Sequence, residues 1–185
     1  LAVDLHADQI QGFFDMPVDN LTAASVLAKS VSKDNLVVVS PDVGGVVRAR
    51  VFAKHFDAPI AIIDKRRPRP NENEVMNVIG EVSGKNAVIF DDMIDTGGTI
   101  SKAASALLDK GALSVSACVT HGVFSGKAFE TLGNSSFEQI VVTDSIPLVA
   151  GAPTKIKQVS IAPLLANAIK RVHDGKSLSE LFKDG

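Results

Sequence analysis

The sequence predicts an α/β fold with a mostly parallel central sheet flanked by helices. Short β-rich runs alternate along the chain with alanine-rich runs of helical spacing, which is the pattern of strand–helix–strand units. Several β-rich runs are apolar on both faces, as in a sheet that helices cover on both sides. The 185 residues, of which 45% are hydrophobic, suffice for one buried core, so we expect one domain.

Taken in order, six apolar or β-branched segments are expected to be strands. They are Leu1–His6, Asn35–Ser40, Pro59–Asp64, Asn86–Asp92, Leu113–His121 and Gln139–Ser145. Five alanine-rich segments are expected to be helices between and after them. They are Ala23–Ser32, Val46–Phe56, Ile100–Gly111, Gly126–Asn134 and Ala162–Gly175. In the third helix the apolar residues fall on one face, and Gly111 stands where a helix would end.

Composition and charge exclude several classes of function. The net charge of −2 provides no general field for a polyanion, so we expect no nucleic-acid partner. The single cysteine, Cys118, cannot form an intramolecular disulfide and is expected as a buried strand residue in a reducing compartment. Charges, prolines and glycines interrupt every hydrophobic stretch, and no signal peptide is seen. We therefore expect a cytoplasmic protein with no membrane partner.

Polar, charged and glycine residues follow the ends of the predicted strands. Parallel strands end at one edge of a sheet, where α/β proteins bind ligands. The segments that should meet there are His6, Ser40–Gly45, Asp64–Asn71, Asp91–Thr99 and Thr120–Gly126. This edge suits a charged small molecule.

The segment "DDMIDTGGT" combines acidic residues with a phosphate-sized turn. Gly97 and Gly98 permit close backbone approach, and Thr99 is expected to be the N-cap of a helix that begins at Ile100. Backbone N–H groups at such a helix start suit a phosphate. Asp91 and Asp92 are acceptors for sugar hydroxyls or for hydrated Mg²⁺. The alternative is a capped turn with solvated acids, which would leave three aspartates repelling one another.

Two further segments carry charge suited to phosphates. In "SPDVGG", Gly44 and Gly45 can wrap a second anion and Asp42 offers an oxygen ligand for Mg²⁺, although a plain turn explains the pattern equally well. "KRRPRP" holds four cations, and its prolines predict an exposed mobile loop. Such a loop is often only solvated surface. At this edge, however, Lys65 and Arg67 could close on a phosphoryl group during its transfer.

The acidic segment resembles a known motif. "VIFDDMIDTGGT" is similar to the ribose-phosphate binding motif of the type I phosphoribosyltransferase fold. The resemblance implies that the two acids meet the ribose 2- and 3-hydroxyls and that Asp95–Thr99 hold the 5-phosphate. The implied substrate-binding residues are Asp91, Asp92, Asp95, Thr96, Gly97, Gly98 and Thr99.

Longer segments resemble the ribose-phosphate pyrophosphokinases, also called phosphoribosyl pyrophosphate synthetases. The matching segments are "VDLHADQIQGFFDMPVDNL", "VVVSPDVGGVVRA", "AIIDKRRPRPNENEVMNVIG", "THGVFSGKA" and "SLSELF". The resemblance implies transfer of the β,γ-diphosphoryl group of ATP to the 1-hydroxyl of ribose 5-phosphate, with Mg²⁺ as cofactor. It also implies that Lys65 and Arg67 are catalytic, that Asp42, Gly44 and Gly45 form the pyrophosphate loop, and that His6 and Asp42 serve the metal or the ATP phosphates. His121 is left open between a site-lining and a structural role.

The resemblance further implies what surrounds this chain. Family members carry an N-terminal half of the same fold, so residues 1–185 are expected to be the C-terminal catalytic half, poorly active alone. They assemble as homo-oligomers, commonly hexamers, and "SLSELF" matches a segment implied in regulatory phosphate binding. Two other functions stay open: a phosphoribosyltransferase that consumes phosphoribosyl pyrophosphate, and a non-catalytic associated subunit of the synthetase.

Overall fold

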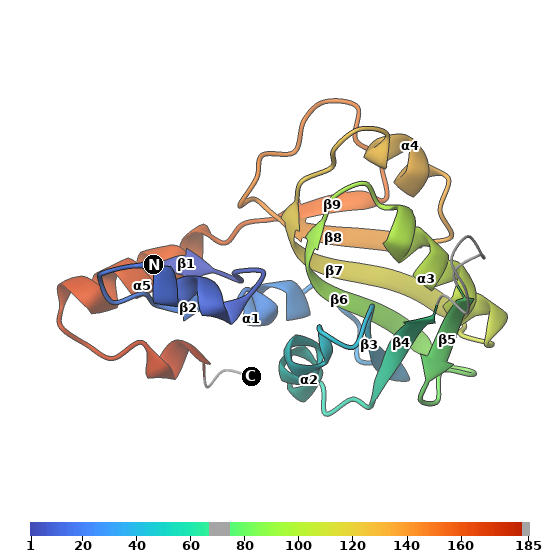
Figure 1. Cartoon of the computed structure of the whole chain (residues 1–185), viewed down its shortest axis with the longest axis horizontal. Coiled ribbons are helices and arrows are strands. Elements are labelled where there is room, and N and C mark those ends of the chain that lie inside the picture. Colours follow the sequence, from blue (N-terminus) through green and yellow to red (C-terminus); the bar gives the residue numbers. More distant parts are fainter. Residues whose placement is uncertain (67–74, 183–185) are drawn as a thin grey trace.

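A seven-stranded sheet forms the centre of the protein, in the computed structural model that describes residues 1–66 and 75–182. The strand order is β5-β4-β3-β6-β7-β8-β9, and neighbours pair in parallel except for β5, which is antiparallel to β4 at one edge (Figure 1). The strands are β3 (Leu36–Ser40), β4 (Ile60–Arg66), β5 (Val75–Ile79), β6 (Asn86–Ile94), β7 (Ser114–Gly122), β8 (Gln139–Thr143) and β9 (Ile156–Val159). The predicted fold class is confirmed.

Helices cover both faces of the sheet, which explains why its central strands are apolar on both sides. Helices α3 (Gly98–Asp109) and α4 (Ala128–Gly133) cover one face, where Val37 and Val39 join the core. Helices α1 (Ala24–Ala28) and α2 (Val46–Lys54) cover the other, where Val38 lies. There Phe52 of α2 stacks on Phe90 of β6 with ring centroids 4.2 Å apart, and burial of one such ring contributes about 1.5–3 kcal/mol.

A smaller lobe joins the two ends of the described chain beside this sheet (Figure 1). It contains β1 (Ala2–Val3) and β2 (Asn20–Leu21), paired in parallel, and the 3₁₀ turn η1 (Asp8–Phe13). It also contains helix α5 (Ala162–His173) and the 3₁₀ turn η2 (Ser179–Phe182). A separate apolar cluster of Leu21, Ala168 and Leu178 holds these pieces together. The lobe contributes one side of the candidate site.

The structure corrects several predicted elements. The segment Leu1–His6 forms only the short β1, outside the central sheet, because Asp4 adopts a φ of 42° that ends the extended run. Lys65 and Arg66 belong to β4, where they pair with Met76 and Val75, rather than to a loop. Strands β5 and β9 were not predicted from the sequence. Arg67 lies outside the described residues, as does the rest of "KRRPRP".

Strand order opens a crevice at the carboxyl edge of the sheet. The chain passes from β3 to β4 on one side, then returns through β5 to place β6 on the other side of β3. Connections that leave neighbouring strands in opposite directions separate the loops there, and ligands bind at such points. The loops concerned are Pro41–Gly45 after β3 and Asp95–Gly97 after β6. None of the helices within the described residues is long and apolar enough to cross a membrane.

Candidate functional site

Two cavities lie on either side of the acidic residues near the end of β6. The smaller, about 130 Å³, is lined by Asp91, and the larger, about 590 Å³, is lined by Asp92. The smaller is bordered further by Lys65, Asp95, Thr96, Gly97 and Thr99. The larger is bordered further by Asp4, His6, Asp8, Gly44, Arg48 and Lys54. Adjacent residues of one strand thus face two different spaces.

The smaller cavity ends on the amino terminus of α3. Gly97 is the N-cap residue, and its φ of 77° turns the chain from β6 into the helix, which begins at Gly98. The prediction of Thr99 as N-cap is therefore wrong, because the glycine makes the turn two residues earlier. The N–H groups of a first helical turn have no partner within the helix, and the helix dipole is positive there. This end of the cavity suits a phosphate group.

Asp95 lies at the rim of the same cavity and is held from a neighbouring loop. Its Oδ1 accepts a hydrogen bond from the Ser125 hydroxyl, which belongs to the loop between β7 and α4. Thr96 and Thr99 are exposed at the helix start, where both residues border the cavity. Four residues of the predicted segment Asp95–Thr99 therefore line the smaller cavity, and Gly98 does not.

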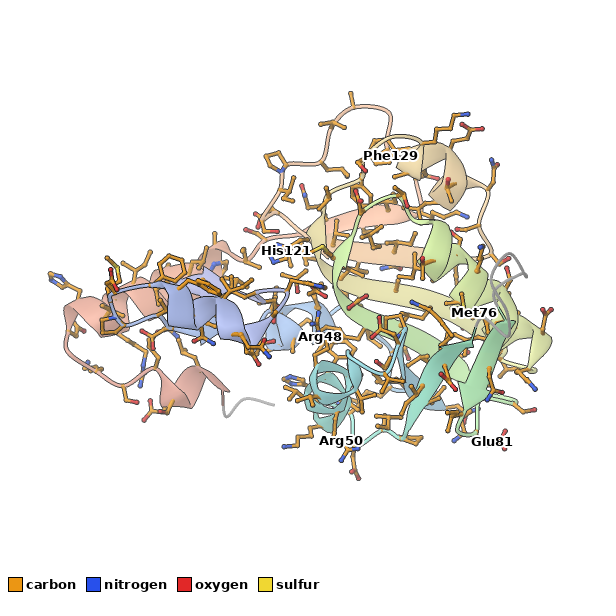
Figure 2. All side chains as sticks on the ribbon, viewed as in Figure 1. Arg48, Arg50, Met76, Glu81, His121 and Phe129 are labelled. Atoms are coloured by element: carbon orange, nitrogen blue, oxygen red, sulfur yellow. The ribbon has the colours of Figure 1, made fainter. Side chains whose placement is uncertain are left out.

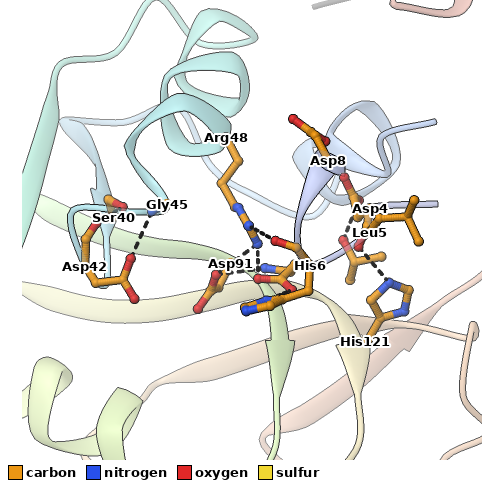
Figure 3. Close-up of polar contacts among 12 residues, drawn as sticks. Asp4, Leu5, His6, Asp8, Ser40, Asp42, Gly45, Arg48, Asp91 and His121 are labelled. Carbon is orange, nitrogen blue, oxygen red and sulfur yellow. Dashed lines mark hydrogen bonds and ion pairs between the residues drawn. The ribbon is translucent and has the colours of Figure 1, made fainter. Parts of the chain in front are cut away.

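Asp91 and Asp92 have different surroundings although they are adjacent. The Asp92 side chain is 4% exposed; its Oδ1 accepts from Arg48 Nη1, and its Oδ2 lies 2.8 Å from His6 Nδ1. The Asp91 side chain is 24% exposed, and its Oδ1 lies 3.3 Å from Arg48 Nη1 (Figure 3). Asp91 thus faces the smaller cavity, whereas Asp92 is engaged by Arg48 and His6.

Burial changes the acidity of Asp91. Desolvation raises its pKa to about 6 from an ordinary value of 3.8, and Asp42 adds to the rise, while Arg48, Lys65 and His6 oppose it. A carboxyl group with this pKa is mostly ionised at neutral pH. It is also stabilised by any further cation that enters the cavity.

The loop after β3 brings a third acid to the site, and β4 brings a lysine. Asp42 Oδ1 accepts a hydrogen bond from the Gly45 N–H at 2.9 Å, which folds the loop against the start of α2. A side chain at Gly45 would place Cβ 2.9 Å from Ser40 Oγ, so the tight turn favours glycine. Lys65 Nζ lies 3.8 Å from Asp42 Oδ2 and lines the smaller cavity. The predicted Asp42, Gly45 and Lys65 come together.

His6 reaches the site by a different route from the one predicted. It stands after β1 in the small lobe, and its ring nitrogen Nδ1 contacts Asp92. The side chain is 68% exposed, so the ring borders the larger cavity rather than the protein core. Arg48 was missed by sequence reasoning. Its only signal is its position in the first turn of the helix that follows the glycine pair.

His121 has a structural role in positioning the lobe. Its Nε2–H donates to the carbonyl oxygens of Val3 and Asp4 at 3.0 and 3.2 Å, and its Nδ1 lies 2.8 Å from Ser145 Oγ. Neither of the two cavities at the carboxyl edge is lined by His121. This answers the question that the sequence left open.

The acids near the smaller cavity could hold a magnesium ion only together with oxygen ligands from outside the described residues. Within the described residues, no group of three or more histidines, cysteines or acids has the geometry of a metal site. Mg²⁺ commonly takes one or two carboxylates together with phosphate oxygens and waters. Asp42 and Asp91 can supply such carboxylates. His6 is better suited to a phosphate, because Mg²⁺ prefers oxygen ligands.

These features define an α/β domain of the type I phosphoribosyltransferase fold. The crystal structure of orotate phosphoribosyltransferase from Aeropyrum pernix has a similar fold, with a TM-score of 0.51. The match covers 80% of this chain and 75% of that one at 19% identity, so the similarity concerns the fold alone. The family model described as phosphoribosyl synthetase-associated domain matches residues 66–183. The chain belongs to that family.

Closely similar proteins share one description. The ribose-phosphate pyrophosphokinase of Xanthomonas campestris pv. campestris is 56% identical over 191 residues, and the match covers 100% of this chain and 60% of that protein. That of Bordetella pertussis is 56% identical over 189 residues, covering 100% and 61%. The crystal structure of phosphoribosylpyrophosphate synthetase from Mycobacterium smegmatis matches with a TM-score of 0.84 and 40% identity, covering 94% of this chain and 58% of that one. The chain thus spans about 60% of the length of these curated relatives.

Proposed function

We propose that this chain carries the ribose 5-phosphate site and the diphosphoryl-transfer residues of a ribose-phosphate pyrophosphokinase. The reaction uses ATP and ribose 5-phosphate and yields phosphoribosyl pyrophosphate and AMP. The observation that carries the proposal is the pair of cavities that share the Asp91–Asp92 acid pair, one with a helix amino terminus and Lys65, the other with His6 and Arg48. Names of the similar proteins support it.

Ribose 5-phosphate would occupy the smaller cavity. Its phosphate would accept hydrogen bonds from the N–H groups and hydroxyls of residues 96–99, as anions do at helix amino termini. A ribose hydroxyl would donate to Asp91, the acid that lines this cavity. This arrangement would direct the sugar away from α3 and toward Lys65 and Asp42.

ATP phosphates would lie between the loop Pro41–Gly45 and His6. The 1-hydroxyl oxygen of the sugar attacks Pβ, the bond from Pβ to the α,β-bridging oxygen breaks, AMP leaves with that oxygen, and the hydroxyl proton is released. Lys65 would offset charge on the transferred group, and Arg67, outside the described residues, is proposed to join it. Mg²⁺, when bound, would supply charge neutralisation between the phosphates, with Asp42 and Asp91 as its protein ligands.

We also propose a domain organisation, an oligomeric state and a location for the protein. Residues 1–185 are taken as one catalytic domain that works in a cytoplasmic homo-oligomer. The relatives are longer than this chain, and the proposal assigns part of the nucleotide site to the remaining segment.

AMP formation tests the proposal. The chain is assayed alone and fused to the remaining segment of the Xanthomonas relative, with ATP, ribose 5-phosphate and Mg²⁺. We expect AMP and phosphoribosyl pyrophosphate in equal amounts from the fusion, and little from the chain alone. Lys65→Ala should lower kcat about 10²- to 10³-fold, the loss typical of a group that stabilises charge during transfer. Lys157→Ala, at an exposed position on β9, is the matched control.

The two alternatives give different results in the same assay. A phosphoribosyltransferase would make no AMP from these substrates and would consume phosphoribosyl pyrophosphate when a base is added. A non-catalytic associated subunit would bind ribose 5-phosphate, but any turnover would be unchanged by Lys65→Ala. Either result would contradict the proposal.

A further inference from the structure

We propose that Arg48 is a positioning residue that links the His6 segment to the acid pair of β6. This link, called the tether below, keeps the two cavities in a fixed position relative to each other. The inference rests on the proposed function for its meaning in the reaction. The tether itself rests on geometry alone. Nothing in the sequence motifs or in the names of similar proteins assigns a role to this arginine.

Arg48 joins three segments that are distant in sequence (Figure 3). From α2, its Nη1 contacts Asp92 Oδ1 and lies 3.3 Å from Asp91 Oδ1, both on β6. Its Nη2 donates to the carbonyl oxygen of His6 at 3.2 Å. One guanidinium group therefore links the helix after the glycine pair, the acidic strand end and the small lobe.

The buried carboxylate of Asp92 makes this link costly to break. A carboxylate that is 4% exposed needs partners, and it finds them in Arg48 and in the ring of His6. The backbone and the ring of His6 are thus fixed from two directions, by Arg48 at the carbonyl oxygen and by Asp92 at Nδ1. Loss of Arg48 leaves only the ring contact, and it leaves two adjacent acids without their shared cation.

The three contacts require a planar fork of donors. The guanidinium presents Nη1 toward β6 and Nη2 toward the lobe at the same time. A lysine at this position is a single charged point and cannot reach both sides with fixed geometry. Arg48→Lys would keep the positive charge but lose the simultaneous contacts with β6 and the small lobe. This substitution therefore separates positioning from charge.

Arg50 supplies a matched control on the same helix. It is exposed, and Figure 2 shows it below α2, whereas Arg48 lies above α2 toward the lobe and β6. Amide hydrogen exchange is measured for residues 5–9 in the full chain, as wild type, Arg48→Lys and Arg50→Lys. We expect about tenfold faster exchange in Arg48→Lys, the effect of losing one charge-assisted contact, and no change in Arg50→Lys.

A second readout links the tether to the reaction. In the fused, active form, Arg48→Lys should raise KM for ATP about tenfold or more with a smaller change in kcat, because His6 would no longer be held over the larger cavity. Arg50→Lys should leave both constants unchanged. Equal exchange rates in Arg48→Lys and Arg50→Lys would overturn the tether. Should the fused wild type make no AMP, the proposed function fails, while the exchange comparison still decides the tether.

A double substitution guards against a simple loss of folding. Asp92→Asn removes the negative charge from the same contact and should give a similar rise in exchange at residues 5–9. The combined Arg48→Lys, Asp92→Asn variant should show less than the sum of the two effects, because both break one interaction. Additive effects would show that Arg48 and Asp92 act separately and would contradict the proposal.

Discussion

The two adjacent acids on β6 differ in their burial and their partners. Asp92 is buried between Arg48 and His6, whereas Asp91 faces a cavity. Desolvation raises the pKa of Asp91 to about 6. The folded state therefore holds a proton on Asp91 more tightly than the unfolded state does. Ionisation of Asp91 therefore destabilises the folded state. The stabilising contribution of the protonated Asp91 carboxyl is fully present below pH 4 and is lost as the pH rises from about 4 to 6.

Asp91→Asn should remove this dependence on pH. The amide stays neutral, so the free energy of unfolding of the variant should gain on that of wild type between pH 4 and 7. The gain should reach about 3 kcal/mol, which is the shift from 3.8 to about 6 converted at 1.36 kcal/mol per unit. Urea unfolding at a series of pH values measures it. Asp109→Asn, at an exposed position on α3, is the control, and an equal pH trend in both variants would count against the argument.

Single-residue roles were only partly predictable from the sequence. The segment "DDMIDTGGT" predicted that Asp91 and the turn before the helix lie together, and Asp91, Asp95, Thr96, Gly97 and Thr99 line one cavity because they are close along the chain. The partners of Asp92 could not be predicted, since His6 lies 86 positions and Arg48 lies 44 positions away. Contacts at such separations depend on the packing of whole elements.

The start of α3 shows how one glycine fixes an element. Gly97 has a φ of 77°, and a Cβ at this position would lie 2.8 Å from Leu132 Cγ on α4. The turn therefore both aims the first N–H groups of α3 and lets α4 pack closely. The end of the smaller cavity and a helix contact thus depend on the same missing side chain.

Gly97→Ala should destabilise the protein by about 2–4 kcal/mol, from the left-handed backbone and the contact with Leu132 together. Gly98→Ala is the matched control, because a Cβ there meets nothing within 4 Å. The control should leave stability unchanged or raise it by up to about 1 kcal/mol. Urea unfolding compares the two variants. Equal midpoints would show that the turn tolerates a side chain.

Among the strands of the central sheet, the buried strands were predictable from the sequence, whereas the edge strands β5 and β9 were not. β3, β6, β7 and β8 were predicted to within two residues, because strands covered on both faces read as continuous apolar runs. β9 is four residues long with exposed Lys157 and Gln158, so it carries little apolar signal. β5 takes its place by pairing with β4 at the sheet edge.

In the whole molecule, polar contacts attach the small lobe to the sheet. Asp4 Oδ2 accepts from the Thr120 hydroxyl at 2.7 Å and from the Ala23 N–H at 2.9 Å. Together with the bonds from His121 to the backbone of Val3 and Asp4, they fix the chain just before His6. The larger cavity exists only while the lobe stays in place, because its lining comes from both parts.

Thr120→Val should loosen this attachment with almost no change in side-chain volume. Thr120 is fully buried, so Asp4 would lose a donor that water cannot easily replace, at a cost of about 1–3 kcal/mol. Unfolding in urea should show the loss, and amide exchange of residues 2–9 should quicken. Thr154→Val, at an exposed threonine, should change neither quantity. A similar response from both variants would argue against a specific link.

The apolar cluster of the lobe has a consequence for substitutions far from the site. Leu178 packs with Leu21, the side chain of the adjacent Asn20 accepts a hydrogen bond from the Leu5 N–H at 3.1 Å, and Leu5 precedes His6. A change at Leu178, nearly the full length of the chain away, therefore acts on the histidine through a relay of only a few contacts. A substitution at Leu178 is therefore expected to shift His6 at the edge of the larger cavity.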